Sequence, residues 1–273
     1  MPARPNRDLR GRTVVITGGS SGIGRACALE FGAAGCTVVI AGRRPEPLDQ
    51  TRAELEAKGV RCLAVPTDVR SREQVYALRD AALEPTRRLD IWVNNAGYGM
   101  VARFEGMRED DLEAIWQTNV VGSFHGCQAA LQPMRRQGHG HIMNVSSLAG
   151  RYALPLNAAY AATKHALNAL GQSLGAELEG TGIHVTTVMP GLTETGFFAA
   201  MVDKVGPTGT HLVRAMPAEV VARAMVRCAR RPRERLVFAP GGATTLVLAE
   251  AFPIIFRTIA RQYLKVRLSG RKA

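Results

Sequence analysis

Short apolar runs alternate with longer amphipathic runs along most of the chain. The short runs predict strands, and they lie at residues 13–17, 37–41, 61–66, 91–94, 141–146, 184–189 and 236–239. The longer runs have helical spacing and lie at residues 23–34, 47–58, 72–83, 110–136, 157–179 and 217–230. Regular alternation of strand and helix is typical of a parallel sheet with helices on both faces. The pattern therefore predicts a single α/β domain with a doubly wound parallel sheet of about seven strands.

Two segments break this alternation. Residues 192–216 are rich in glycine and threonine and are too long for an ordinary connection, so we interpret them as a mobile substrate lid. Residues 244–268 begin apolar and then carry Arg257, Arg261 and Lys265 four apart, which predicts an amphipathic helix with a basic stripe. Its charges interrupt it too early for a membrane span. It would pack on another subunit, cap the substrate cleft or lie on a membrane surface.

The composition is that of one globular unit. The 273 residues are 46% hydrophobic and 21% charged, which is sufficient for one large core. We predict a single domain over residues 1–273, divided into a basic leader at 1–11, a core at 12–242 that includes the lid, and a C-terminal extension at 243–273. The leader contains no apolar run of the kind found in signal peptides. We therefore expect a cytoplasmic protein, with membrane association through the extension as the open alternative.

Charge and cysteine usage exclude several functions. The net charge of +12 is spread over the chain and aromatic residues make up only 5%, so we predict no nucleic-acid binding. The five cysteines are scattered and form no C-x-x-C pair, which is typical of reduced thiols. His139 and His141 flank a glycine without a carboxylate or cysteine nearby, so we predict no metal site.

The first candidate for chemistry is Tyr160-Ala-Ala-Thr-Lys164 in the predicted helix at 157–179. Side chains four apart lie on one face of a helix, so the phenol and the ammonium would project together. Tyrosine titrates near pH 10 in water, and a neighbouring cation lowers that pKa by favouring the phenolate. We predict that Tyr160 is a general acid or base with a lowered pKa. On its own, the pair also occurs on solvated helix faces.

A glycine-rich segment follows the first predicted strand and precedes the first helix. Glycines at this place allow a tight turn and let a pyrophosphate approach the amino end of the helix. The predicted phosphate contacts are Gly18, Ser20, Ser21, Gly22, Ile23 and Gly24. After the second strand stand Arg43 and Arg44, where an acidic residue would bind the ribose of NAD. We predict that Arg43 binds a 2′-phosphate, which favours NADP(H) over NAD(H), and that Arg44 is the solvated alternative.

A further motif, Asn94-Asn95-Ala96-Gly97, ends the fourth strand, and Ser147 ends the fifth shortly before Tyr160. The order T-G-x-x-x-G-x-G, N-N-A-G, serine and Y-x-x-x-K resembles the short-chain dehydrogenase/reductase family over about residues 10–240. Members of this family are oxidoreductases with a Rossmann-like fold. The resemblance therefore implies this fold and a nicotinamide cofactor.

The resemblance also implies roles for individual residues. Tyr160 exchanges the proton, Lys164 holds the nicotinamide ribose and lowers the pKa of the phenol, and Ser147 binds the substrate oxygen, with Ser146 as the second choice. Asn119 fixes a water in a proton relay. Without the resemblance, it would be interpreted as an asparagine whose side chain makes its hydrogen bonds within its own helix. The implied cofactor contacts, beyond the glycine-rich turn and Arg43, are Asp68, Val69, Asn95, Ala96, Gly97, Tyr160, Lys164, Pro190, Gly191, Thr193 and Thr195.

These assignments predict hydride transfer between NADP(H) and the carbonyl or secondary alcohol of a small molecule. The apolar tail and the apolar residues of the lid favour an apolar substrate, and the alternative is that these residues face the core; the lid residues are Phe197, Phe198, Met201 and Val202. One alternative is reduction of a 3-oxoacyl group on an acidic carrier protein, which the basic charge favours. Another is a protein that senses NADP(H) or acts as a scaffold without turnover. By resemblance we expect a homodimer or homotetramer formed through the helices that contain Asp110 and Tyr160.

Overall fold

The computed structural model describes residues 8–195, 201–205 and 215–238, together with the isolated helical positions Thr258, Arg261, Gln262 and Leu264. Seven strands form one parallel sheet in the order β3-β2-β1-β4-β6-β7-β11. The strands are β1 (Thr13–Thr17), β2 (Thr37–Gly42), β3 (Cys62–Pro66), β4 (Ile91–Asn94), β6 (Gly140–Val145), β7 (Ile183–Met189) and β11 (Arg235–Val237). The predicted α/β fold is confirmed, with each predicted strand at its expected place in the chain.

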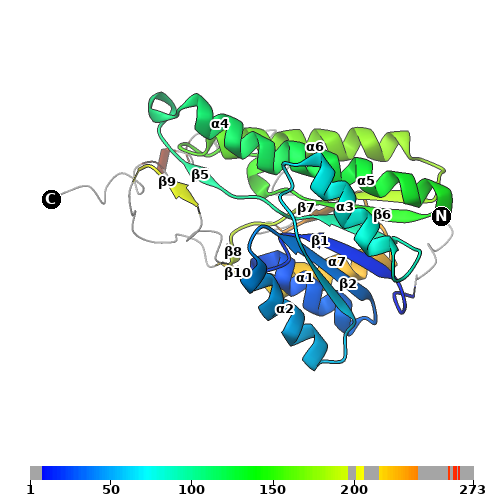
Figure 1. The fold of residues 1–273 in the computed structure, drawn as a ribbon. Helices are drawn as coiled ribbons and strands as arrows, with labels where there is room; N and C mark the ends of the chain where they lie inside the picture. The colour runs from blue at the N-terminus through cyan, green and yellow to red at the C-terminus, as the bar shows by residue number, and fades with distance from the viewer. Residues whose placement is uncertain are drawn as a thin grey trace.

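Helices cover both faces of this sheet (Figure 1). One face is covered by α1 (Gly22–Ala33), α2 (Pro45–Ala57) and α7 (Ala218–Arg230). The other is covered by α3 (Arg72–Leu83), α4 (Glu109–Trp116), α5 (Gly122–Gln137) and α6 (Ala158–Glu177). Each layer encloses its own apolar cluster against the sheet. Because central strands are buried on both faces, they are mostly apolar, and every residue of β1 is buried, including the threonines at its two ends.

The helix predicted over residues 110–136 is interrupted, so that prediction is wrong in detail. α4 ends at Trp116, residues Gln117–Val121 form a π-helical turn, and α5 begins at Gly122. Asn119 lies in this turn, and its carboxamide is bonded to the backbone of Tyr98 in the neighbouring loop. π-turns inside α-helices are frequent at functional sites. The bulge therefore places Asn119 against the loop that follows β4.

The predicted lid contains short strands that the sequence pattern did not indicate. β8 (Thr193–Glu194) pairs with β10 (Met216–Pro217), and β9 (Val202–Asp203) pairs with β5 (Met100–Val101). Lys204, directly after β9, forms an ion pair with Asp111 in the first turn of α4. Residues 196–200 and 206–214 of the predicted lid lie outside the described residues, as does most of the predicted tail helix. Lid mobility therefore stays a prediction.

Among the described helices, none is both long and apolar enough to span a bilayer.

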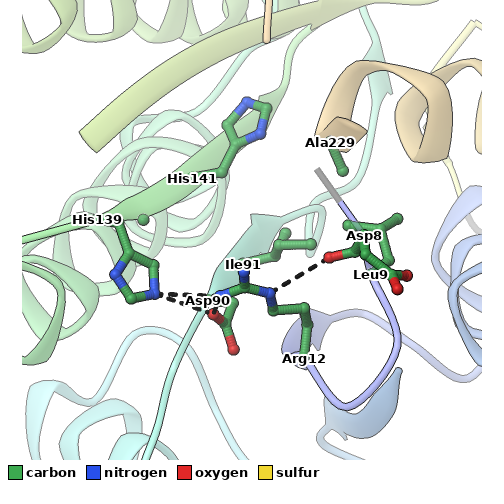
Figure 2. A pocket seen from close by; sticks show the side chains of 9 residues that line it. Asp8, Leu9, Arg12, Asp90, Ile91, His139, His141 and Ala229 are labelled. Atoms are coloured by element: carbon green, nitrogen blue, oxygen red, sulfur yellow. Dashed lines mark hydrogen bonds and ion pairs between the residues drawn. The ribbon is translucent and has the colours of Figure 1, made fainter. Parts of the chain in front are cut away.

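A cavity of about 180 Å³ lies at the edge of the sheet where the strands begin. Figure 2 shows Asp90 within it, with Arg12 and His139 directed toward its carboxylate. That carboxylate is only 6% exposed and accepts hydrogen bonds from Arg12 (2.8 Å), Arg88 (2.7 Å) and the Thr13 amide (2.9 Å). Burial alone would raise the pKa of Asp90, but the bonds from Arg88, Thr13 and Arg12 bring it down to about 2. The charged form of Asp90 therefore stabilises the folded state.

We expect Asp90→Asn to lower the free energy of unfolding by about 2 kcal/mol at pH 7, because the pKa falls from 3.8 to about 2 on folding. A carboxyl with a depressed folded pKa contributes above its unfolded pKa, and this contribution is lost as the pH falls from about 4 to about 2. Urea unfolding of the wild type and the variant at pH 7 and pH 2.5 measures the difference in the free energy of unfolding. The exposed Asp80→Asn is the control. If Asp90→Asn lowered the free energy of unfolding equally at both pH values, the charged carboxylate would not be the source of the stabilisation.

Candidate active site

The residues predicted to act in catalysis and cofactor binding gather at the opposite edge of the sheet, where the strands end. In a parallel sheet all strand ends of one kind meet at one edge, and ligands bind where the strand order reverses. Here the order reverses at β1, which lies between β2 and β4. The loops after β1, β2, β4, β6 and β7 therefore surround one site, whereas the cavity of Figure 2 lies at the far edge.

The glycine-rich turn after β1 has the shape that a pyrophosphate requires. Gly18 has a φ of +67°, and a Cβ on Gly24 would lie 2.1 Å from the Gly18 carbonyl oxygen, so only glycine fits. The side-chain Nδ2 of Asn95 donates to the carbonyls of Thr17 (3.0 Å) and Gly18 (3.2 Å), which holds the turn closed. Ser21 precedes α1 without a side-chain cap, and the first turn of α1 has no acidic residue. The amide groups at this helix end can therefore bind an anion.

The ends of β2 and β3 carry the residues predicted to bind the adenosine. Gly42 and Pro66 are partners in the sheet, so Arg43 and Asp68 leave neighbouring strands at the same edge. Asp68 accepts hydrogen bonds from the Arg70 guanidinium at 2.6–3.0 Å. These bonds lower the pKa of Asp68, and the charge of Arg43 adds to the effect. Arg43 thus lies within electrostatic range of the adenosine end of the predicted site.

Tyr160, Ser147 and Lys164 lie next to one another in the structure. The Tyr160 phenol and the Ser147 hydroxyl are hydrogen-bonded. The Lys164 ammonium lies 5.6 Å from the centre of the Tyr160 ring and donates to the Val145 carbonyl at 2.9 Å. Ser146, the alternative serine, is buried and donates to the Lys164 carbonyl at 3.0 Å. Ser147 is therefore the serine that contacts Tyr160.

The predicted lowering of the tyrosine pKa is wrong in this structure. Burial raises the pKa of Tyr160 to about 12, although the bond with Ser147 opposes the shift. Burial also lowers the pKa of Lys164 to about 8. The ammonium lies over the ring and donates to the Val145 carbonyl, and the desolvation of the phenol outweighs what its charge contributes to stabilising the phenolate. The phenol therefore keeps its proton at neutral pH, which suits a proton donor.

Asn119 is fully buried and uses its carboxamide to join two segments. Its Oδ1 accepts from the Tyr98 amide at 3.1 Å, and its Nδ2 donates to the Tyr98 carbonyl (3.0 Å) and the Thr163 hydroxyl (3.1 Å). Thr163 in turn donates to the Tyr160 carbonyl at 2.7 Å. Asn119 therefore links the loop after β4 to the helix that carries Tyr160. Its role in fixing a water stays a prediction.

The segment after β7 extends from the serine loop to the glycine-rich turn. The Pro190 carbonyl accepts from the amide of Leu148 at 2.9 Å, next to Ser147. At the other end, the side chain of Thr195 packs within 3.0 Å of the position that a Cβ on Gly22 would take. These contacts place the predicted carboxamide-binding residues between the catalytic and phosphate-binding parts of the site.

Thr17 is a site residue that the sequence pattern did not single out. Its hydroxyl accepts from the amides of Asn95 (3.0 Å) and Ala96 (3.1 Å) and donates to the Val93 carbonyl (3.2 Å). It therefore fixes the loop after β4 against the turn after β1. The available signal was a threonine at the last position of a strand, directly before a glycine turn.

The comparisons with known proteins agree with this geometry. The family model for short chain dehydrogenases matches residues 12–206, and the chain belongs to this family of oxidoreductases. An uncharacterized oxidoreductase of Staphylococcus aureus (strain USA300) is 35% identical over 192 residues, which are 70% of this chain and 82% of the relative. The glycine betaine reductase ATRR of Emericella nidulans is 33% identical over 84% of this chain, a region that is 18% of that longer protein.

Solved structures show the same fold. A short chain dehydrogenase/reductase from Burkholderia phymatum, in complex with NAD, has a TM-score of 0.82 and 27% identity, covering 91% of this chain and 96% of that one. An alcohol dehydrogenase from the archaeon Thermococcus sibiricus, complexed with 5-hydroxy-NADP, has a TM-score of 0.74 and 25% identity, covering 84% and 96%. The protein is therefore an oxidoreductase enzyme of this family, and its strand-end site fits a nicotinamide cofactor.

Proposed function

We propose that this enzyme transfers a hydride between NADP(H) and the carbonyl or secondary alcohol of an apolar small molecule, with Tyr160 as the general acid or base. The observation that carries the proposal is the hydrogen bond between Tyr160 and Ser147, with Lys164 beside them, at the edge that holds the glycine-rich turn. Tyr160, Ser147 and Lys164 supply a proton donor, an oxygen ligand and a cation in one place.

In the direction of reduction, the carbonyl carbon would accept a hydride, which is the chemistry that a nicotinamide cofactor would supply when bound. Tyr160 gives its phenolic proton to the carbonyl oxygen, and the Ser147 hydroxyl donates a hydrogen bond that stabilises the negative charge on that oxygen. Lys164 holds the ribose and stabilises the phenolate left on Tyr160. Oxidation uses the reverse path, in which the phenolate accepts the proton of the alcohol.

An apolar substrate is supported by the surroundings of Tyr160. Its ring packs against a cluster that contains Tyr98, Met100, Met107, Ala102, Ile115 and Ala159. β5, which supplies part of this cluster, also pairs with β9 of the predicted lid. Met100, Ala102, Ile115 and Ala159 are buried, so the partly buried Tyr98, Met107 and Tyr160 are the members that can contact a substrate, and their apolar surface favours alkyl or aromatic groups.

The proposal is tested by following the absorbance of NADPH, and of NADH in parallel, over apolar ketones, aldehydes, steroids and 3-oxoacyl thioesters. We expect turnover of at least one apolar carbonyl compound with NADPH. Turnover of thioesters on a carrier protein only, lost at high salt, would instead support the carrier-protein reductase. Tight NADPH binding without any turnover would favour the sensing function.

The cofactor preference is tested at Arg43. We expect Arg43→Ala to raise the Kd for NADPH by about 10- to 100-fold and the Kd for NADH by less than about 2-fold, because a charged hydrogen bond contributes about 1.5–3 kcal/mol. Fluorescence titration of both cofactors measures the ratio. Arg44→Ala is the matched control, since both arginines are exposed and adjacent. Equal losses for both cofactors would refute the 2′-phosphate contact.

We also propose that two copies associate through α4, α5 and α6. Leu112 and Trp116 on α4 and Phe124 on α5 are 37–44% exposed, and a second copy packed on these helices would remove their apolar surface from water. Light scattering tests this: a monomer mass at micromolar concentration would refute it.

A further inference from the structure

The loop that carries Ser147 is attached to α6 by a contact that has no part in the chemistry above. Gly150 ends the short 3₁₀ turn Leu148–Gly150 (η3), and its carbonyl accepts a hydrogen bond from the Asn168 amide at 2.7 Å. Asn168 lies one helical turn beyond Lys164 on α6. The carboxamide oxygen of Asn168 makes no hydrogen bond to any part of the chain that the structure describes. The side chain of Asn168 therefore contacts the Ser147 loop through its Nδ2 atom.

The loop approaches the helix more closely than any side chain at position 150 would allow. A Cβ on Gly150 would lie 2.6 Å from the Lys164 carbonyl oxygen and 2.7 Å from the Asn168 nitrogen. The same Lys164 carbonyl accepts the hydrogen bond of Ser146 at 3.0 Å. The loop is thus fixed to α6 on both sides of Ser147, by Ser146 before it and by Gly150 after it.

This attachment decides where the Ser147 hydroxyl points. Its oxygen accepts from the amide of Ala149 within the 3₁₀ turn at 3.1 Å, so its proton is left to donate to the Tyr160 oxygen in this structure and to the substrate oxygen in the proposed reaction. A shift of the turn would move the Ala149 amide and rotate the hydroxyl away from the phenol. The path from Asn168 to Tyr160 therefore runs through three hydrogen bonds and one short turn.

We propose that Asn168 is a positioning residue that sets the geometry of Ser147 against Tyr160 by donating to the Gly150 carbonyl. The inference rests on the proposed roles of Ser147 and Tyr160. Asn168 itself touches neither residue in the contacts above, so its effect passes through the turn. Misplacement of a reacting group by about 1 Å costs about 100-fold in rate, which sets the scale of the expected effect.

The first test is Asn168→Asp, which keeps the shape of the side chain and removes the donor. We expect kcat to fall by about 10- to 100-fold, while the KM for NADPH stays within about 2-fold. A protonated carboxyl can donate to the Gly150 carbonyl, so kcat relative to wild type should recover as the pH is lowered from 8 to 5.

Gly150→Ala tests the same contact from the other side, because its Cβ would push the loop off α6. We expect the same split, with kcat reduced and the KM for NADPH retained, but with no recovery in acid. The exposed Gln172→Ala, one turn further along α6, is the control and should behave as wild type. Retention of more than half of kcat by Asn168→Asp at pH 8 would overturn the inference. When Asn168→Asp keeps its activity, Tyr160→Phe in the same assay separates the two proposals. An inactive Tyr160→Phe means that only the positioning role of Asn168 fails, whereas an active Tyr160→Phe means that the proposed function fails.

Discussion

Replacing Tyr160 with phenylalanine should lower kcat by about 1,000-fold or more in both directions, while the Kd for NADPH changes by less than about 3-fold. Phenylalanine keeps the ring that packs beside Tyr98 and Met100 and removes only the hydroxyl that Ser147 contacts. General acid catalysis contributes about 10²–10⁴-fold to the rate, and removing the Tyr160 hydroxyl also removes the hydrogen-bond partner of Ser147. Steady-state rates and fluorescence titration of NADPH separate the two effects.

A matched control removes the same atom from a tyrosine far from the site. Tyr76 lies on α3, with the guanidinium groups of Arg72 and Arg79 at 5.1 and 4.7 Å from its ring centre. Tyr76→Phe keeps these contacts and should leave both kcat and the NADPH affinity unchanged. If Tyr160→Phe keeps more than a few per cent of the wild-type rate, a different group donates the proton.

Much of the fold could be predicted because buried parallel strands leave a simple signal. β1 and β4 are apolar except for polar residues at their ends, since helices cover both of their faces. Once the strands are parallel, Gly18, Arg43 and Ser147 must meet at one edge, whatever the details of the loops. The gathering of the site therefore followed from strand order and motif position.

The parts that the sequence did not predict depend on three-dimensional surroundings. The pKa of Tyr160 was expected to fall because Lys164 is four residues away, but burial, which no spacing reveals, raises it. The π-turn carries Asn119, which is hydrogen-bonded to Tyr98, a residue in a different loop. The contact between Asn168 and Gly150 joins residues eighteen positions apart, and nothing in either local sequence indicates it.

Lys164→Met should make the protein more stable and less active. Lys164 is 5% exposed, and burial lowers its pKa from 10.5 to about 8, so the charged form is destabilised on folding by about 3 kcal/mol. Methionine avoids this cost, and the lost bond to the Val145 carbonyl offsets about 1 kcal/mol of the gain. We expect a Tm a few degrees higher at pH 7, with kcat/KM lower by about 100- to 1,000-fold.

The pH dependence distinguishes this explanation from better packing of methionine. Below about pH 8 the folded and unfolded states both hold the lysine proton, so the penalty is fully present. Between about pH 8 and 10.5 the folded wild type releases its proton first and becomes relatively more stable, so the Tm difference should shrink from pH 7 to pH 9.5. Calorimetry measures both values, and Lys58→Met, at a lysine that is 56% exposed, is the control. A Tm difference that is the same at both pH values would mean that folding does not destabilise the charged form of Lys164. The proposal that its buried ammonium stabilises the phenolate would then be contradicted.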